Sequence, residues 1–397
     1  MKKLIFLQLS IMMFMQYMLL AVWWVPFAAY LRNLPFLDSY HVWLILCSMA
    51  IGSMAAPLVG VIADRYLSSE KLLTGLNLLV ALFLFFATQQ TSFAGLMITV
   101  TLAMLCYMPT WSLTSSIAMT HISSEQFPRI RLLGTIGWVA SGLFSMVAIH
   151  VFKTPEFDGT GLPLYCGVGA AFVAALFNLF LPKTPPATNK SVKYSIADIF
   201  GLRVISALKN KYFNRFILIS FLTVIPFSLF YTYGSQFLAD ENFKYITVTL
   251  NWGQFAELFF LFITTSILIK YGFKKALLFG LIAMFIRYIA LYSGIELGQP
   301  WLYSLGILSH GLIFGLFFVA GQVYTDKLVP QEYRAQAQGF LSFVLWGIGI
   351  FAGNLISGWL IDHTSDWSFL FLIASVCTLL VIVLLFMFFK NPERAEV

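Results

Sequence analysis

Long apolar runs restrict the fold of this chain more than any other feature of its sequence. The last of them, Leu372–Phe389, contains no charged residue and approaches the roughly 20 apolar residues that a helix needs to cross a bilayer. Of the 397 residues, 60% are apolar and only 10% are charged, whereas soluble domains carry roughly 25% charged residues. So few charges cannot cover the surface of a soluble protein of this length, and a soluble enzyme is therefore excluded.

The runs also distinguish between the two structures that can span a membrane. Backbone polar groups in lipid must pair internally, which leaves helices and closed β-barrels. Barrel strands alternate polar and apolar residues over roughly ten positions, whereas the runs here are continuous. We therefore predict an all-α integral membrane protein with twelve transmembrane helices, at about 4–31, 41–62, 72–88, 93–118, 131–151, 163–181, 213–237, 247–269, 275–294, 301–325, 336–361 and 367–389.

The longest interruption, 182–212, is rich in Lys, Pro and Ser and separates two sets of six segments. We predict an N-terminal six-helix bundle over 1–181 and a cytoplasmic central loop over 182–212. A C-terminal six-helix bundle with a short cytoplasmic tail follows over 213–397. Two pseudo-symmetric halves are typical of secondary transporters, which bind their substrate near the membrane midplane.

The basic residues predict the orientation, because cytoplasmic loops carry an excess of Lys and Arg. Nearly all of them lie at a terminus, in a loop that follows an even-numbered segment or in the first residues after such a loop; the exceptions are Arg32, Lys153, Lys244 and Arg287. Both termini are therefore predicted to be cytoplasmic. The apolar run after Lys2-Lys3 extends to Leu31, beyond the roughly 7–15-residue core of a signal peptide. We expect a retained first helix and a multi-pass protein of the bacterial inner membrane.

Several other classes of function lack support. The net charge of +7 is spread over many short loops, unlike the single basic face of a nucleic-acid-binding protein. The four cysteines lie inside apolar runs and form no ligand cluster. Neither the ATP-binding pattern GxxxxGKS/T nor the nucleophile pattern GxSxG occurs. We predict no cofactor, no metal, no nucleic-acid partner and no enzymatic activity.

Several motifs carry a resemblance to a known family. Gly60-Val-Ile-Ala-Asp64-Arg65, after the second segment, resembles the signature of the loop between helices 2 and 3 in the major facilitator superfamily. Further matches run through nearly the whole chain: Gln16-Tyr17 to Trp23, Cys106-Tyr-Met-Pro-Thr110, Phe127-Pro128, Arg131-Leu-Leu-Gly-Thr-Ile-Gly-Trp138, Gln254-Phe-Ala-Glu257 and Arg334-Ala-Gln-Ala-Gln-Gly339. Together they resemble the nucleoside:proton symporter family, whose fold is the major facilitator fold.

The resemblance implies roles for particular residues. The positions that contact substrate in the family correspond to Arg131, Thr135 and Trp138 in helix 5, Ser228 and Tyr231 in helix 7, Gln254 and Glu257 in helix 8, and His310 and Phe314 in helix 10. The next residue, Gly315, stands where the family has an acid implicated in transport. The resemblance also implies that Gly60, Asp64 and Arg65 form a conformational loop that stabilises the outward-open state.

Glu257 is the one acid in the middle of a predicted span. A charge at the bilayer centre is costly, so an intramembrane carboxyl is a functional candidate; the alternative is a carboxyl that only packs. Gln254 shares a helix face with Glu257, as expected for a cavity wall. His310 titrates in the range of a proton carrier, although a histidine in a helix is as often simply hydrogen-bonded. We predict Glu257 and His310 as proton-coupling residues.

Arg131, Thr135 and Trp138 form one stripe of helix 5. Arg131 offers a planar fork of donors for ribose hydroxyls or base carbonyls, and Trp138 offers a face on which a base can stack. The alternative for Arg131 is a side chain that reaches the cytoplasmic headgroups. We hypothesise that Arg131 and Glu257 approach each other in one conformation and that protonation of Glu257 weakens this contact.

These observations predict a secondary transporter that imports nucleosides with protons by alternating access, as a monomer in the lipid bilayer. Two alternatives remain at this point. The absence of an acid at Gly315 suits a facilitator, or a symporter for another polar solute such as a sugar. The chain also fits a membrane sensor that has the fold but does not transport.

Overall fold

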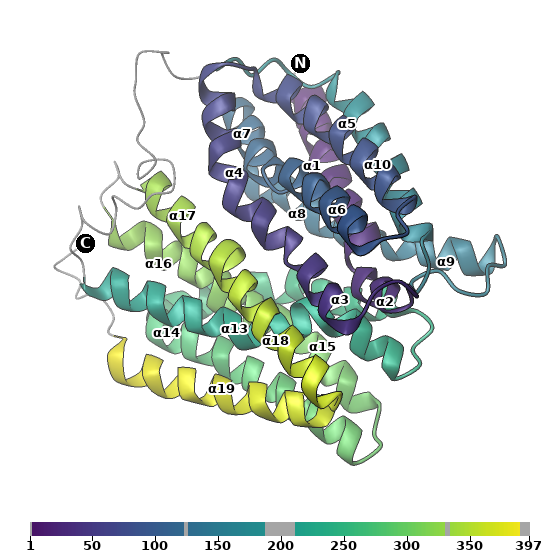
Figure 1. The fold of residues 1–397 in the computed structure, drawn as a ribbon. Helices are drawn as coiled ribbons and strands as arrows, with labels where there is room; N and C mark the ends of the chain where they lie inside the picture. Colours follow the sequence, from purple (N-terminus) through teal and green to yellow (C-terminus); the bar gives the residue numbers. More distant parts are fainter. Residues whose placement is uncertain (1, 123–125, 187–210, 330–333, 390–397) are drawn as a thin grey trace. The chain divides into compact units, whose positions relative to one another are not determined.

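A computed structural model describes residues 2–122, 126–186, 211–329 and 334–389, and within these ranges the chain is helical and has no β-strand. Eleven helical stretches are long and apolar enough to cross a membrane, and the shorter apolar helix Leu162–Asn178 lies at the predicted sixth span. The prediction of an all-α protein with twelve spans is therefore confirmed (Figure 1).

The elements of the N-terminal part are α1 (Lys2–Trp24), α2 (Phe27–Arg32), α3 (Ser39–Leu46), α4 (Ser48–Arg65), α5 (Ser69–Thr88), α6 (Phe93–Tyr107), α7 (Thr110–His121), α8 (Phe127–Ala140), α9 (Gly142–His150) and α10 (Leu162–Asn178). Those of the C-terminal part are α13 (Lys211–Asp240), α14 (Ile246–Glu296), α15 (Trp301–Ile313), η1 (Phe314–Val319), α16 (Ala320–Leu328), α17 (Arg334–Ser342), η3 (Phe343–Gly349), α18 (Ile350–Thr364) and α19 (Trp367–Phe388).

Several predicted spans consist of two helices. The first is interrupted beside Pro26 and the fourth beside Pro109, because proline lacks the amide hydrogen that continues a helix. The second and fifth spans break at Cys47 and Ser141, where the sequence has no proline. The eighth and ninth spans form one element, α14, which turns at Gly272 with φ of 74°. Glycine adopts this left-handed conformation at no steric cost.

The tenth and eleventh spans each contain a wide π-helical turn, η1 and η3. Such turns are often found at functional sites, because the extra residue redirects neighbouring side chains. Two aromatic residues on these turns, Phe314 and Trp346, lie with their ring centroids 6.5 Å apart.

The contacts of the described residues form two compact units. The first comprises Met1–Lys193 and Tyr233–Asn251, and the second comprises Tyr194–Thr232 and Trp252–Val397. The boundaries thus divide both α13 and α14. The predicted central loop, 182–212, lies largely outside the described residues, and the three predicted domain boundaries stay a prediction.

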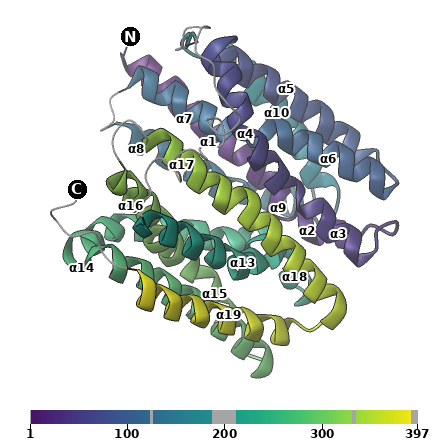
Figure 2. The same ribbon diagram turned by 60° about the vertical axis from the view of Figure 1, so that its left-hand side comes forward.

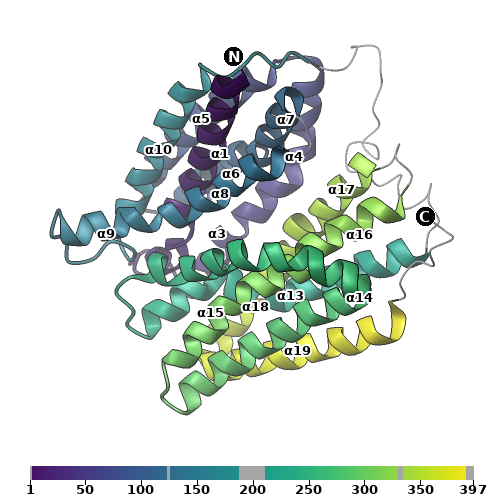
Figure 3. The ribbon, with the colours of Figure 1, turned by 180° about the vertical axis from the view of Figure 1, so that it is seen from behind.

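In the first unit, α1 packs against α8 and α10, and α5 packs against α10 and α6 (Figures 1 and 3). Glycines permit the close approach of α8 to α1. A Cβ at Gly137 would overlap the carbonyl oxygen of Phe14, and one at Gly134 would lie 2.9 Å from the ring of Tyr17. The glycine spacing in the helix 5 motif therefore brings the residues between and beside these glycines close to α1.

In the second unit, α14 and α15 cross closely. A Cβ at Gly311 would lie 2.5 Å from the backbone carbon of Ala256, and one at Gly253 would lie 2.9 Å from the carbonyl oxygen of Ile307. Figure 2 shows α13 beside α18. Thr232 of α13 donates to the Asn354 side chain of α18 at 2.7 Å, which joins these two helices. The crossing of α14 and α15 places Gln254 and Glu257 beside His310.

Candidate functional site

The predicted substrate-contacting residues are divided between the units, and each group is described by itself. Within the first unit, the guanidinium carbon of Arg131 lies 4.3 Å from the centroid of the Tyr17 ring. Tyr17 in turn stacks on Trp111 with a centroid distance of 5.6 Å and an interplanar angle of 7°. A guanidinium over an aromatic face is attracted by the ring quadrupole. The guanidinium group of Arg131 is therefore positioned by its contact with the Tyr17 ring, which itself stacks on Trp111.

Thr135 and Trp138 follow Arg131 along α8. Thr135 is buried, whereas Arg131 and Trp138 are partly exposed. Trp138 packs at the edge of the apolar cluster that includes Tyr17. The backbone carbonyl of Trp138 accepts a 3.4 Å hydrogen bond from the amide of Asn251. The structure thus brings the three predicted residues of helix 5 onto one stripe beside α1.

Within the second unit, Gln254, Glu257 and His310 come together. The amide nitrogen of Gln254 donates to Nε2 of His310 at 2.9 Å, so this ring nitrogen acts as the acceptor. Oε2 of Glu257 lies 3.8 Å from the same nitrogen. Glu257 is only 4% exposed. The one predicted mid-span acid is therefore buried beside an imidazole.

Aromatic rings surround His310. The imidazole stacks on Phe314 with a centroid distance of 5.8 Å and lies 6.3 Å from Phe227, which stacks on Tyr231. Tyr231 also contacts Trp346 at 5.7 Å. We name these five side chains the aromatic wall: Phe227, Tyr231, His310, Phe314 and Trp346. The flat faces of such rings suit a planar heterocycle.

Ser228 and Gly315 are packed into the protein. The hydroxyl of Ser228 donates to the Ile225 carbonyl at 2.8 Å, and a Cβ at Gly353 would overlap that hydroxyl. At Gly315, a Cβ would lie 2.5 Å from Oγ1 of Thr264. Gly315 stands where the resemblance implies an acid, and the Thr264 side chain occupies the space beside it.

Arg287 is fully buried in the second unit. Its Nε donates to the Gly306 carbonyl at 3.1 Å and to the Ser309 hydroxyl at 3.3 Å. Its guanidinium carbon lies 5.2 Å from the centroid of the Phe230 ring. Among the described residues, its two terminal nitrogens have no hydrogen-bond partner. The sequence assigned no role to Arg287.

The motif that contains Gly60 differs from the prediction. It was expected in a loop, but α4 continues through it to Arg65, and a Cβ at Gly60 would meet no atom within 4 Å. The side chains of Asp64 and Arg65 lie outside the described residues. Their conformational role stays a prediction.

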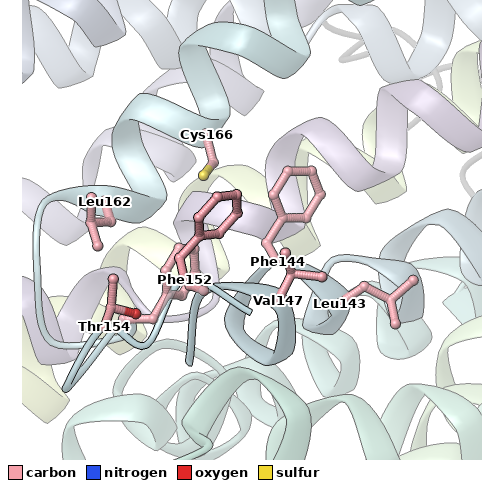
Figure 4. A pocket seen from close by; sticks show the side chains of 9 residues that line it. Leu143, Phe144, Val147, Phe152, Thr154, Leu162 and Cys166 are labelled. Atoms are coloured by element: carbon pink, nitrogen blue, oxygen red, sulfur yellow. The ribbon is translucent and has the colours of Figure 1, made fainter. Parts of the chain in front are cut away.

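An apolar pocket of about 430 Å³ lies beside α9 and α10 (Figure 4). It is lined by Leu143, Phe144, Val147, Ala148, Phe152, Thr154, Phe157, Leu162 and Cys166. No predicted site residue lines it, and Thr154 supplies the only hydroxyl. Such a wall suits hydrocarbon better than a ligand rich in hydroxyls. In the part of the chain that the structure describes, no group of three or more His, Cys, Asp or Glu side chains could hold a metal ion.

Two sets of residues escaped prediction. Phe227 and Trp346 complete the aromatic wall, but a single aromatic residue in an aromatic-rich span carries no positional signal. Asn251 is a polar residue near the end of a span and Asp158 lies in a loop, and polar residues are common at both kinds of position. The recurrence of Asn251 one turn before Gln254 was the only available indication that this face of the helix is polar.

Comparisons with known proteins identify the family of this chain. A family described as nucleoside H+ symporter matches residues 3–394. The putative nucleoside transporter YegT of Escherichia coli is 32% identical, over 98% of this chain and 94% of its own length. The xanthosine permease of Escherichia coli is 26% identical, over 98% of each chain. The crystal structure of the nucleoside transporter NupG superposes with a TM-score of 0.83 at 24% identity, covering 98% of this chain and all of NupG, and it supports the predicted fold.

Proposed function

Because this chain belongs to the nucleoside H+ symporter family, we propose that it imports nucleosides together with protons by alternating access. The members of this family are transporters, so the predictions of transport and of no enzymatic activity are confirmed. The further proposal concerns which side chains bind the nucleoside and which carry the proton.

The contact between Glu257 and His310 is the observation that carries the proposal. Both groups change charge on protonation, both are buried, and they lie 3.8 Å apart. Gln254 holds Nε2 of His310, so rotation of this amide frees the nitrogen to accept a proton. Glu257 binds the transported proton in this scheme, and His310 exchanges a proton with it. In this scheme Glu257 carries the proton although Gly315 supplies no acid, and no further acid is needed.

The aromatic wall supports recognition of a nucleoside rather than a sugar alone. Base–aromatic stacking contributes about 1–3 kcal/mol per base, whereas a simple sugar has no flat π-face. Tyr231, His310 and Phe314 lie within this wall, and Gln254 offers an amide beside it. Ser228 supports the packing of α13 in this proposal, because its hydroxyl already donates to the backbone.

The residues of α8 are proposed to contact the same substrate. Arg131, held over Tyr17, presents its donors to ribose hydroxyls or base carbonyls, and Trp138 stacks on the base. Thr135 supplies a hydroxyl between them. The approach of Arg131 to Glu257 in one conformation is part of this proposal. Deprotonated Glu257 would pair with Arg131, and protonation would end that pairing.

We also propose that the protein is a monomer in the bacterial inner membrane with both termini cytoplasmic. The basic residues support this orientation, since nearly all of them fall at the termini or after even-numbered spans. In this orientation the loops that follow α2, α9 and α13 face the outside, where the protons arrive.

Uptake by proteoliposomes tests the function. Labelled uridine or adenosine is offered with an imposed inward proton gradient and without one, and labelled xylose serves as the comparison solute. The proposal predicts accumulation of the nucleoside only with the gradient and no accumulation of xylose. Equal nucleoside uptake without the gradient would indicate a facilitator. Xylose accumulation would indicate a sugar symporter, and no uptake of either solute would favour a sensor.

A further inference from the structure

Two sequence motifs meet inside the first unit although neither supplies a residue predicted to contact substrate. Gln16-Tyr17 lies on α1, and Cys106-Tyr-Met-Pro-Thr110 runs from the end of α6 to the start of α7. Polar groups inside a membrane span are costly unless they are paired. Together with one residue of α5, the motifs contribute four buried polar side chains, which we name the buried network: Gln16, Asn77, Tyr107 and Thr110.

The carboxamides of Gln16 and Asn77 pair with each other. Nε2 of Gln16 donates to Oδ1 of Asn77 at 3.1 Å, and Nδ2 of Asn77 donates to Oε1 of Gln16 at 2.9 Å. Nε2 of Gln16 also donates to the Thr110 hydroxyl at 2.8 Å, and this hydroxyl donates to the Tyr107 carbonyl at 2.6 Å. The reciprocal pairing fixes the orientation of both carboxamides.

The hydroxyl of Tyr107 connects the buried network to an aromatic pair. It donates to the backbone carbonyl of Gln16 at 2.6 Å and accepts from Nε1 of Trp111 at 3.1 Å. The Trp111 ring stacks on Tyr17 with an interplanar angle of 7°. An indole that is bonded at its N–H group and stacked on a second ring has few other orientations.

The same Tyr17 ring contacts Arg131, whose guanidinium carbon lies 4.3 Å from the ring centroid. Gly134 leaves the space in which they meet, because a Cβ there would lie 2.9 Å from the Tyr17 ring and 3.2 Å from Nη1 of Arg131. Buried networks whose hydrogen bonds are satisfied restrict side chains to one arrangement. The contacts therefore continue from the buried network to the guanidinium of Arg131.

We propose that Tyr107 is a positioning residue for nucleoside binding. Its hydroxyl fixes the Trp111 ring and, through that ring, the Tyr17 ring. These rings determine the orientation in which Arg131 presents its donors to the nucleoside, whereas Tyr107 itself does not touch the substrate. The inference rests on the proposed function of Arg131.

Tyr107→Phe tests the proposal because it retains the ring but removes the donor to Gln16 and the acceptor for Trp111. Uridine affinity is measured by calorimetry on the full-length protein in nanodiscs, and we expect it to fall by about 3- to 10-fold. The indole N–H resonance of Trp111 in the NMR spectrum, assigned with Trp111→Phe, should shift. Unchanged uridine affinity would overturn the proposal.

A double-mutant cycle distinguishes positioning from a general loss of stability. The effect of Tyr107 passes through Arg131 in this proposal, so the two residues are energetically coupled. In an Arg131→Lys background, we expect Tyr107→Phe to lower uridine affinity by less than it does in the unmodified protein. Independent, additive losses would overturn the proposal.

Thr110 offers a second variant and its matched control. Thr110→Val removes the hydroxyl that Gln16 contacts, so we expect lower uridine affinity and a shifted Trp111 resonance, and Thr110→Ser should restore both. Thr114 is also buried on α7, but its hydroxyl donates to backbone carbonyls of its own helix. Thr114→Val should retain uridine affinity. Equal losses in Thr110→Val and Thr114→Val would overturn the proposal.

Failure of the proposed function gives a different result. If Arg131→Lys binds uridine as tightly as the unmodified protein, Arg131 does not bind the nucleoside and this inference falls with the proposed function, although the Trp111 resonance still shifts in Tyr107→Phe and Thr110→Val. An unchanged Trp111 resonance in both variants, while Arg131→Lys lowers uridine affinity, would contradict this inference alone.

Discussion

Nε2 of His310 lies 3.8 Å from Oε2 of Glu257, and Gln254 donates to the same ring nitrogen at 2.9 Å. The histidine nitrogen thus accepts from an amide in this conformation and cannot at the same time hold a proton there. Proton exchange between His310 and Glu257 therefore requires that the Gln254 amide turns away. Rearrangement of a residue predicted to bind substrate is linked in this way to a change in protonation.

Replacing His310 with Phe separates stacking from proton exchange. Phe retains a ring against Phe314 and Phe227, and an aromatic pair contributes only about 0.5–1.5 kcal/mol beyond its buried area, so uridine binding should change by about tenfold or less. Proton-driven accumulation should be largely lost. Binding is measured by calorimetry and accumulation in proteoliposomes. His363→Phe, at an exposed position on α18, is the control; retained accumulation in His310→Phe would exclude the proton role.

Trp138→Ala removes the proposed stacking surface of α8. Because stacking of a base on an aromatic ring contributes about 1–3 kcal/mol, we expect uridine affinity to fall by roughly 5- to 150-fold. The control is Trp359→Ala, since Trp359 is 53% exposed on α18 and is assigned no contact with substrate. Equal losses in the two variants would indicate a general defect in folding.

Arg131→Lys keeps the positive charge but removes the planar fork and its face over Tyr17. Cation–π contacts contribute about 0.5–2 kcal/mol, and a lysine ammonium cannot form two parallel hydrogen bonds to one partner. We expect a fall of roughly tenfold in uridine affinity and a small fall in thermal stability from the weaker contact with Tyr17. An unchanged affinity would support the alternative in which Arg131 only contacts headgroups.

Gly137→Ala tests the packing of α8 on α1. Its new methyl group would overlap the carbonyl oxygen of Phe14, and overpacking costs about 1–3 kcal/mol. Gly169→Ala on α10 meets no atom within 4 Å, so the better helix propensity of Ala should leave stability equal or higher. Thermal unfolding in detergent compares the two. A lower midpoint for Gly169→Ala than for Gly137→Ala would refute the packing argument.

The apolar runs predicted the spans because a helix that crosses lipid must be apolar over most of its length, and this requirement is visible in the local sequence. The breaks beside Pro26 and Pro109 were also readable, since proline acts on its own helix. The breaks at Cys47 and Ser141 and the turns η1 and η3 were not predicted, because no proline marks them in the sequence.

The site residues likewise divide into those that the local sequence predicted and those that it did not. Gln254 and Glu257 were predictable because a buried acid and a neighbouring amide are rare in a span. The contact between Asp158 and Thr247 joins residues 89 positions apart, and nothing in either local sequence indicates it. Trp346 joins the aromatic wall through η3, whose extra residue is likewise invisible in the apolar pattern.

In the proposed mechanism, Glu257 carries the proton that drives nucleoside import. Proteoliposomes containing the unmodified protein or Glu257→Gln are given labelled uridine, first with an inward proton gradient and then with unlabelled uridine trapped inside. We expect Glu257→Gln to abolish accumulation driven by the gradient but to retain uridine exchange, because the amide keeps the shape of the site and cannot release a proton. Undiminished accumulation in Glu257→Gln would contradict it.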